Sequence, residues 1–202
     1  MSVHGKHLPA QERRTITVET VVELASEQNP NDITTAAIAK RMGLTQGSLF
    51  RHFANKEAIL QAVMEWVAER LLARIDKAAK QAVGVVPKLE AIFMAHVGFV
   101  SAHPGVPRIL FGELQRAENT AAKRMVCTLL KKYAGRLTVL MEQGKADGVI
   151  DSEVETASAV IVFIGTLQGL IMQSLLAGEV ERIARDAPGV FEIYLRGIRA
   201  SR

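Results

Sequence analysis

The fold of the N-terminal third of the chain is decided by residues 33–60, which read ITTAAIAKRMGLTQGSLFRHFANKEAIL. Thr34 is a good N-cap for a short helix, because its hydroxyl can accept a hydrogen bond from a free N–H of the first turn. Gly43 can adopt the positive φ that ends this helix in a tight turn. Thr45 then caps a second short helix, Gln46–Phe53. The stretch therefore predicts two short helices joined by a glycine turn.

The side chains of these two helices separate into an inner and an outer set. Ile38, Leu49 and Phe53 can face inward together, whereas the residues left outside on the second helix are polar, small or basic. This arrangement is typical of the helix-turn-helix that binds the DNA major groove. Four basic residues and no acidic residue occur between Ile33 and Lys56, which favours a polyanionic partner. A solvated helix face has the same charge pattern.

The remainder of the chain is helical in pattern and lacks β alternation of useful length. Asn55 can cap a helix of about 27 residues, on the order of 40 Å long, which continues until Gly84 and Pro87 interrupt the apolar pattern. Further helices are expected over residues 10–28, 88–102, 106–114, 119–143, 153–177 and 189–199. The periodicity therefore predicts an all-α protein.

Composition narrows the class of protein. The 202 residues carry a formal net charge of +4 and one cysteine, Cys127, so the chain has no disulfide framework. The first eight residues lack the apolar region of a signal peptide, and we expect a cytoplasmic protein. Thr156–Gly178 has no charged residue and is long enough to cross a bilayer. Because acidic residues flank it on both sides, we expect a helix buried between other helices and no membrane.

A resemblance to a known family covers the segment from Gln11 to about Arg70, which is similar to the DNA-binding domain of TetR-family (TetR/AcrR-type) transcriptional regulators. The turn at 144–150, which reads GKADGVI, and the apolar helix after it resemble the C-terminal half of that family more loosely. One departure is Phe50, where the family usually has a tyrosine whose hydroxyl contacts phosphate. The matching positions are Ile33-Thr34, Ile38-Ala39, Gly43-Leu44-Thr45, Gly47, Leu49-Phe50, His52-Phe53, Lys56-Glu57 and Leu60.

The resemblance implies an all-α fold of about nine helices in two domains. Residues 11–71 are expected to form the DNA-binding domain, with the helix-turn-helix at about 34–53, and residues 72–202 the effector-binding and dimerisation domain. It also implies a cytoplasmic homodimer that binds double-stranded DNA at a near-palindromic operator. The expected function is a sequence-specific repressor of transcription that a small-molecule effector releases from DNA, without a cofactor or metal.

Other functions fit the sequence less well. Within the family, a ligand-independent or activating regulator is the alternative. An architectural DNA-binding protein is a second class, which would bind duplexes with little sequence preference. An all-helical enzyme is a third class, and the chain contains no nucleophile elbow, P-loop, GxGxxG or HExxH that would support it.

The predicted DNA contacts are of two kinds. Base reading needs side chains that project into the major groove, and Gln46 and Ser48 are the candidates, with Thr35 at the edge. Gly47 lets the backbone approach the duplex closely, and Arg51 adds a phosphate contact. The resemblance assigns further phosphate contacts to Thr34, Thr45, His52 and Lys56. The whole predicted DNA-binding set is Thr34, Thr35, Thr45, Gln46, Gly47, Ser48, Phe50, Arg51, His52 and Lys56.

A basic N-terminal arm has two interpretations. Lys6, Arg13 and Arg14 either add phosphate contacts or belong to a disordered segment.

The C-terminal half contains candidates for an effector pocket and for a dimer interface. Its aromatic and methionine side chains suit an apolar pocket for a largely apolar effector, and they equally suit a packed core. Gly165 and Gly169, four residues apart, allow a partner helix to approach closely, either across a dimer or within the chain. The predicted pocket lining is Phe93, Met94, His96, Val97, Phe111, Met125, Leu129, Tyr133, Phe163, Gln168 and Met172.

Overall fold

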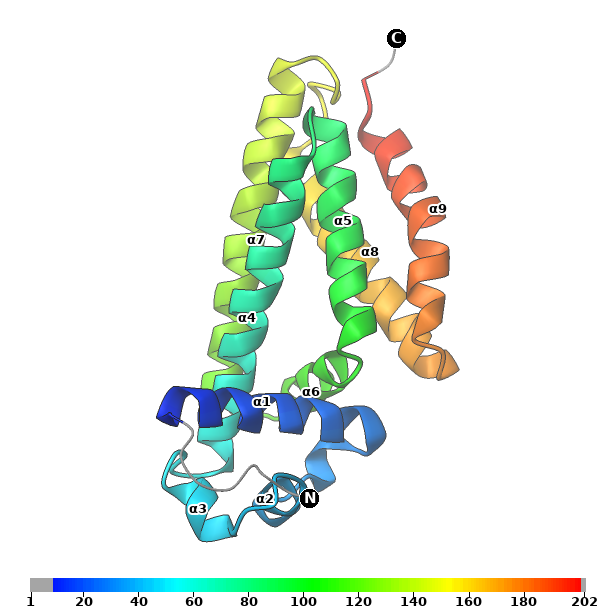
Figure 1. Cartoon of the computed structure of the whole chain (residues 1–202). Coiled ribbons are helices and arrows are strands. Elements are labelled where there is room, and N and C mark those ends of the chain that lie inside the picture. The colour runs from blue at the N-terminus through cyan, green and yellow to red at the C-terminus, as the bar shows by residue number, and fades with distance from the viewer. Residues whose placement is uncertain (1–8, 201–202) are drawn as a thin grey trace. The chain divides into compact units, whose positions relative to one another are not determined.

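The protein is all-α, as the periodicity predicts. The computed structural model (Figure 1) describes residues 9–200, and in this range it contains helices and one isolated β-bridge, between Ile150 and Arg199, but no strand. Among the described residues the α-helices are α1 (Ala10–Glu27), α2 (Thr35–Arg41), α3 (Gln46–Phe50), α4 (Lys56–Gln81), α5 (Val85–Ala102), α6 (Gly105–Leu114), α7 (Ala121–Ala146), α8 (Thr156–Ala177) and α9 (Glu181–Ile198), with a short 3-10 turn, η1 (Pro30–Asp32).

The chain forms two compact units. Of the described residues, the N-terminal unit consists of those up to Val67 together with His103–Met125, and the C-terminal unit consists of Ala68–Ala102 together with those from Val126 onward. From the sequence we expected residues 72–202 to form one domain, whereas α6 and the first turn of α7 belong to the N-terminal unit. The reason is packing, because α6 lies directly against α1 and η1.

The long helix after the helix-turn-helix forms as expected. The amide nitrogen of Ala58 donates to Oδ1 of Asn55 over 2.9 Å, which confirms Asn55 as the residue that caps α4. The helix is 26 residues long, close to the expected length. Since α4 is continuous from Lys56 to Gln81 and contributes residues to both units, it is one of their covalent connections.

The last helix is longer than the sequence predicted. We expected it over residues 189–199. A proline such as Pro188 lacks an N–H and costs about 3 kcal/mol in a helix interior. The helix instead runs from Glu181 to Ile198 with an exposed Pro188 inside it. Each large apolar side chain on its inner face gains about 1.5–3 kcal/mol from burial, which outweighs the proline. The buried residues of that face are Ile183, Ala187, Phe191, Tyr194, Leu195 and Ile198.

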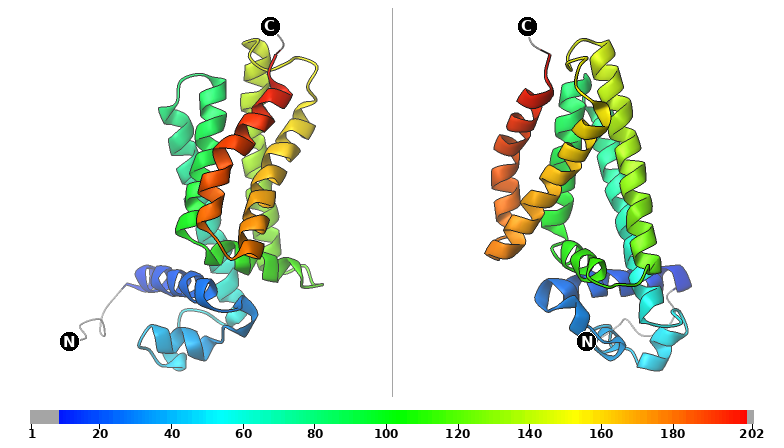
Figure 2. Two further views of the ribbon diagram at one scale, coloured as in Figure 1. Left: turned by 90° about the vertical axis from the view of Figure 1, so that its right-hand side faces the viewer. Right: turned by 180° about the vertical axis from the view of Figure 1, so that it is seen from behind.

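The charge-free helix α8 is not buried on all sides, contrary to expectation. One face packs in the C-terminal unit, against α5 and against α9, which lies beside α8 (Figure 2). The opposite face is open, with Ile161 70% and Leu176 80% exposed. By length and composition alone, α5 and α8 are each apolar enough to cross a membrane, a property shared by core helices of soluble proteins. Within residues 9–200, this apolar face of α8 therefore stays exposed.

Candidate nucleic-acid interface and effector unit

The turn between α2 and α3 has the geometry that the sequence predicts. Gly43 has φ of +66°, in the left-handed region that glycine adopts without strain. The amide nitrogen of Gly43 donates to the carbonyl of Lys40 over 3.1 Å, and that of Leu44 donates to the carbonyl of Ala39 over 2.8 Å. These bonds satisfy carbonyl groups at the end of α2 and set the angle at which α3 leaves the turn.

Both predicted threonine caps are formed. Oγ1 of Thr34 accepts from the amide nitrogen of Ala37 over 3.1 Å, and Oγ1 of Thr45 accepts from that of Ser48 over 3.2 Å. Each hydroxyl still has its own proton to donate, so the same threonine can cap a helix and contact a phosphate. The helix α3 ends at Phe50, three residues earlier than expected. A turn follows it, in which the amide nitrogen of His52 donates to the carbonyl of Leu49.

Two of the predicted base-reading residues lie together. Nε2 of Gln46 donates to Oγ1 of Thr35 over 2.6 Å, which joins the start of α3 to the start of α2. This bond holds the Gln46 amide in one orientation and leaves its oxygen available. Gly47 is exposed, and a Cβ placed there would have nothing within 4 Å. Ser48 is half-buried, so it is the less accessible of the two main candidates.

The exposed apolar residue in this region is Phe50, at 44% exposure. Arg51 beside it is also exposed, and His52 is half-buried. Phe50 can offer a ring to a sugar or base but no hydrogen bond. The phosphate contacts predicted for Arg51 and His52 remain predictions.

Arg14 has a structural role that the sequence did not reveal. Its Nη1 donates to the carbonyl of His52 over 2.8 Å, and its guanidinium carbon lies 4.5 Å from the centre of the Phe53 ring. These contacts tie α1 to the end of the helix-turn-helix. Because Arg14 lies on α1, the disordered alternative is wrong for it, whereas its phosphate contact stays a prediction; Lys6 lies outside the described residues. Arg13 is half-buried on α1.

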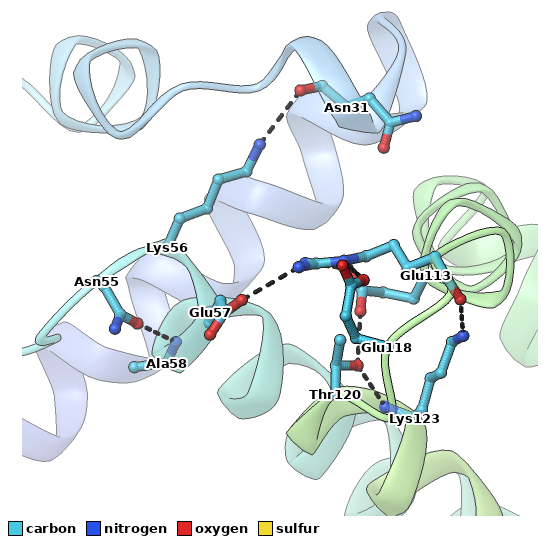
Figure 3. A network of polar contacts seen from close by, with 10 residues as sticks. Asn31, Asn55, Lys56, Glu57, Ala58, Glu113, Glu118, Thr120 and Lys123 are labelled. Atoms are coloured by element: carbon cyan, nitrogen blue, oxygen red, sulfur yellow. Dashed lines mark hydrogen bonds and ion pairs between the residues drawn. The ribbon is translucent and has the colours of Figure 1, made fainter.

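Lys56 bonds inward to the protein. Its Nζ donates to the carbonyl of Asn31 over 3.2 Å, as Figure 3 shows, and the side chain is half-buried. Burial lowers the pKa of Lys56 below its ordinary value, and the nearby Arg116 acts in the same direction. Lys56 thus connects the start of α4 to η1, immediately before the cap of α2. The phosphate contact that the resemblance implies for Lys56 would have to use another N–H of the same ammonium.

An ionic cluster beside Lys56 was not foreseen from the sequence. Nη2 of Arg116 lies 3.1 Å from Oε1 of Glu57 on α4, and its other nitrogens lie 3.5 Å from Glu113 and 3.6 Å from Glu118. Glu113 is buried, and its Oε2 accepts from the hydroxyl of Thr120 over 2.9 Å (Figure 3). The bond to Glu57 is the main cause that raises the pKa of Arg116. Residues 59 positions apart in sequence meet here, which periodicity does not predict.

A cluster of rings forms the centre of the C-terminal unit. The ring of Phe93 lies 5.4 Å from Phe163 and 5.3 Å from Phe191, and Phe163 lies 5.4 Å from Tyr194. The hydroxyl of Tyr194 donates to the carbonyl of Ala159 over 3.1 Å. The geometries are edge-on or tilted, the arrangements that aromatic rings prefer.

One polar pair sits at the edge of this cluster. Nδ1 of His96 lies 3.4 Å from the hydroxyl of Tyr133, which is fully buried. Burial lowers the pKa of His96 to about 4 and raises the pKa of the Tyr133 hydroxyl. Both groups are therefore neutral at physiological pH, and with the hydroxyl of Tyr194 they place polar atoms among these rings.

The residues predicted for the effector pocket do not form one lining. Phe93, Val97, Tyr133 and Phe163 are buried in the C-terminal unit, and Met94, His96 and Leu129 are half-buried there. Gln168 and Met172 are exposed on the outer face of α8, so their assignment to an internal pocket is corrected. Phe111 and Met125 belong to the N-terminal unit. Phe191 and Tyr194 were missed, although both lie in the helix predicted over 189–199, where their three-residue spacing places them on one face.

Two models of protein families match the sequence. The model of bacterial regulatory proteins of the tetR family matches residues 18–63, and that of the C-terminal region of YsiA-like proteins matches residues 65–197, more than half of the chain. The chain therefore belongs to the TetR family of bacterial regulatory proteins, and it is a DNA-binding transcriptional regulator.

Proteins similar to this chain include regulators of known structure. The fatty acid degradation regulator FadR from Bacillus halodurans is 22% identical with a TM-score of 0.83, over 97% of this chain and 100% of that one. FadR from Bacillus subtilis, solved with stearoyl-CoA, is 19% identical with a TM-score of 0.80, over 92% and 99%. The nucleoid occlusion factor SlmA from Marinomonas sp. (strain MWYL1) is 22% identical over 160 residues, 79% of this chain and 81% of that protein. At these identities the solved structures establish the fold.

Proposed function

We propose that the protein is a cytoplasmic, homodimeric repressor that leaves a near-palindromic operator when a small molecule binds its C-terminal unit. One helix-turn-helix reads only a few base pairs, so a dimer that spaces two recognition helices about 34 Å apart is needed for specificity. The proposed role is regulatory and not enzymatic. Gln46, held by Thr35, is the foremost candidate for base reading, since a glutamine amide can bond an adenine edge through both of its groups.

The observation that supports the proposed dimer is the exposed apolar face of α8. Ile161, Gly165, Gly169, Met172 and Leu176 are spaced three or four apart and so share one helix face. The large members are exposed, and a Cβ at either glycine would have nothing within 4 Å. Large apolar residues around two glycines leave room for the backbone of a second helix. A second copy of α8 supplies the same surface, which is the requirement for a twofold-symmetric interface.

The release mechanism proposed is a shift between two populations. An effector that binds one arrangement of the C-terminal unit more tightly lowers operator affinity by the coupling free energy, typically about 1–3 kcal/mol. The continuous helix α4, which contributes to both units, supports this proposal as the connection through which the change passes. Two of the structurally similar regulators were solved with small molecules, stearoyl-CoA and triclosan.

The experiment that tests this proposal selects bound duplexes from a random DNA pool at physiological salt, alongside light scattering to measure the mass in solution. We expect the selected duplexes to contain a near-palindrome with half-sites about one helical turn apart, and the protein in solution to have twice the chain mass of 22.0 kDa. A single unpaired half-site, or a monomeric mass in the DNA complex, would rule out the dimeric reading.

A second candidate is a DNA-binding role without effector release. The aromatic cluster is closely packed, with ring centres 5.3–6.4 Å apart, and a curated relative is a nucleoid occlusion factor. The two candidates differ in one measurement. A ligand-released repressor loses operator affinity in the presence of some compound of a small-molecule library, whereas a ligand-independent DNA-binding protein keeps the same affinity with all of them.

A further inference from the structure

A cleft of about 570 Å³ opens on the C-terminal unit between the end of α4, the start of α5 and the middle of α7. Its apolar part includes Ile92, which is buried, and Leu140 and Val139. None of the residues that line it belongs to the aromatic cluster, and none is among the pocket residues predicted from the sequence. The cleft is therefore a different place from the one where an apolar effector was expected.

The rim of the cleft is strongly basic. Four basic residues and one acidic residue line it, which leaves three positive charges in excess. The acidic residue, Asp76, is occupied by Arg136, because Nε lies 2.6 Å from Oδ1 and Nη2 lies 2.9 Å from Oδ2. This pairing also holds the pKa of Asp76 below its ordinary value. The excess charge thus belongs to Lys80, Lys88 and Lys132, which form no ion pair within residues 9–200.

A glycine in the middle of α7 keeps the cleft open. Gly135 lines the cleft, and a Cβ placed there would have nothing within 4 Å. Glycine destabilises a helix interior relative to alanine. Packing within the chain does not require a glycine at position 135, because an alanine Cβ would meet no neighbour there. The space above Gly135 is continuous with the basic rim, since Lys132, Gly135 and Arg136 line the same cleft.

We propose that this cleft binds a small anionic amphiphile. The acidic head, a phosphate or carboxylate, lies against Lys88 and Lys132, and the apolar portion lies over Gly135 and Ile92. Charge complementarity supports this assignment, because three lysines line the cleft beside its apolar floor, and an acidic head placed among them gains charge-assisted hydrogen bonds that an uncharged ligand cannot form. The inference rests on the proposed function in one respect, that a ligand of this site acts on DNA binding, and it replaces the largely apolar effector expected from the sequence.

The test measures binding by calorimetry to the full-length protein in the absence of DNA. The probes are n-octyl phosphate, n-octanol and inorganic phosphate, each below the concentration at which octyl phosphate forms micelles. We expect octyl phosphate to bind at least about tenfold more tightly than either of the other two, because only it engages both the rim and the floor. Equal binding of octyl phosphate and octanol would overturn the proposal, as would no binding of octyl phosphate.

Variants locate the binding on the chain. The double substitution Lys88→Gln with Lys132→Gln is expected to weaken octyl phosphate binding about tenfold or more. Gly135→Phe, whose Cβ has nothing within 4 Å and whose ring would occupy the cleft, is expected to abolish it. The matched controls are Lys131→Gln, an exposed lysine outside the cleft, and Gly189→Phe, at a glycine with equally open space. Binding that is unchanged in both cleft variants would place the amphiphile elsewhere, for example on the exposed face of α8, and would overturn the proposal.

The folding of the cleft variant and its function are measured separately. Gly135→Phe replaces a poor helix former with a better one, and its thermal unfolding midpoint is expected to stay at or above that of the parent protein. Operator binding is then measured with and without octyl phosphate. Binding of the amphiphile without release of DNA would keep the site and refute ligand release, whereas release of DNA that survives Gly135→Phe would keep ligand release and refute the site.

Discussion

At Gly105 the start of α6 lies against the backbone of α1, and substitution of this glycine by alanine tests the packing described above. A Cβ at Gly105 would lie 2.0 Å from the carbonyl oxygen of Val22 and 3.0 Å from the amide nitrogen of Ser26. Real Cβ atoms essentially never approach another atom within 3.0 Å, so α6 must move about 1 Å away from α1. Both of those neighbours are backbone atoms of a helix, which cannot rotate out of the way as a side chain does.

The cost follows from this displacement. Overpacking of a well-filled contact typically costs about 1–3 kcal/mol, and here the contact lies beside the apolar face of α1 that includes Val18, Val21 and Ala25. The gain in helix propensity from glycine to alanine offsets at most about 1 kcal/mol. We therefore expect Gly105→Ala to lower the free energy of unfolding by about 2 kcal/mol and the melting midpoint by about 4–8 °C.

The assay is urea-induced unfolding followed by circular dichroism at one fixed protein concentration, because the dimerisation proposed above would make the apparent stability depend on concentration. Gly189→Ala is the matched control. Nothing lies within 4 Å of its new Cβ, so it should be neutral or stabilise by about 0.5–1 kcal/mol. If Gly105→Ala is as stable as the parent protein while Gly189→Ala behaves as expected, the close packing of α6 on α1 is refuted.

Three further predictions concern DNA binding, assembly and pH. Gln46→Ala should weaken operator binding by about 1–3 kcal/mol and relax specificity at one base pair, measured by fluorescence anisotropy on operator variants; a uniform loss on all sequences would contradict base reading. Leu176→Glu should yield monomers in light scattering, whereas Val83→Glu, at a 91% exposed position outside α8, should not; a dimer that survives Leu176→Glu places the interface elsewhere. Burial lowers the pKa of His96 to about 4, whereas the same histidine in the unfolded chain binds a proton near pH 6.5. The contribution of His96 to the free energy of unfolding should therefore be fully present above pH 6.5 and fall by about 2–3 kcal/mol as the pH drops to 4. In His96→Gln this part of the stability profile should be flatter, and an unchanged profile would show that His96 is not its source.

The sequence by itself determined the helix-turn-helix and the fold class. Thr34, Gly43, Thr45 and Asn55 act through bonds to residues at most five positions away, so their roles could be predicted without knowing the rest of the chain. The long helix after Asn55 was equally predictable, because its apolar spacing is uninterrupted.

Only the tertiary structure decided the contacts between distant segments and the faces left uncovered. Arg14 meets His52, and Arg116 meets Glu57, across 38 and 59 positions of sequence, separations about which local periodicity carries no information. The burial of one face of α9 overrode the proline that local rules treat as a stop. The exposure of one face of α8, and the gathering of lysines from α4, α5 and α7 around a single cleft, follow from how helices pack in three dimensions and not from any one stretch of residues.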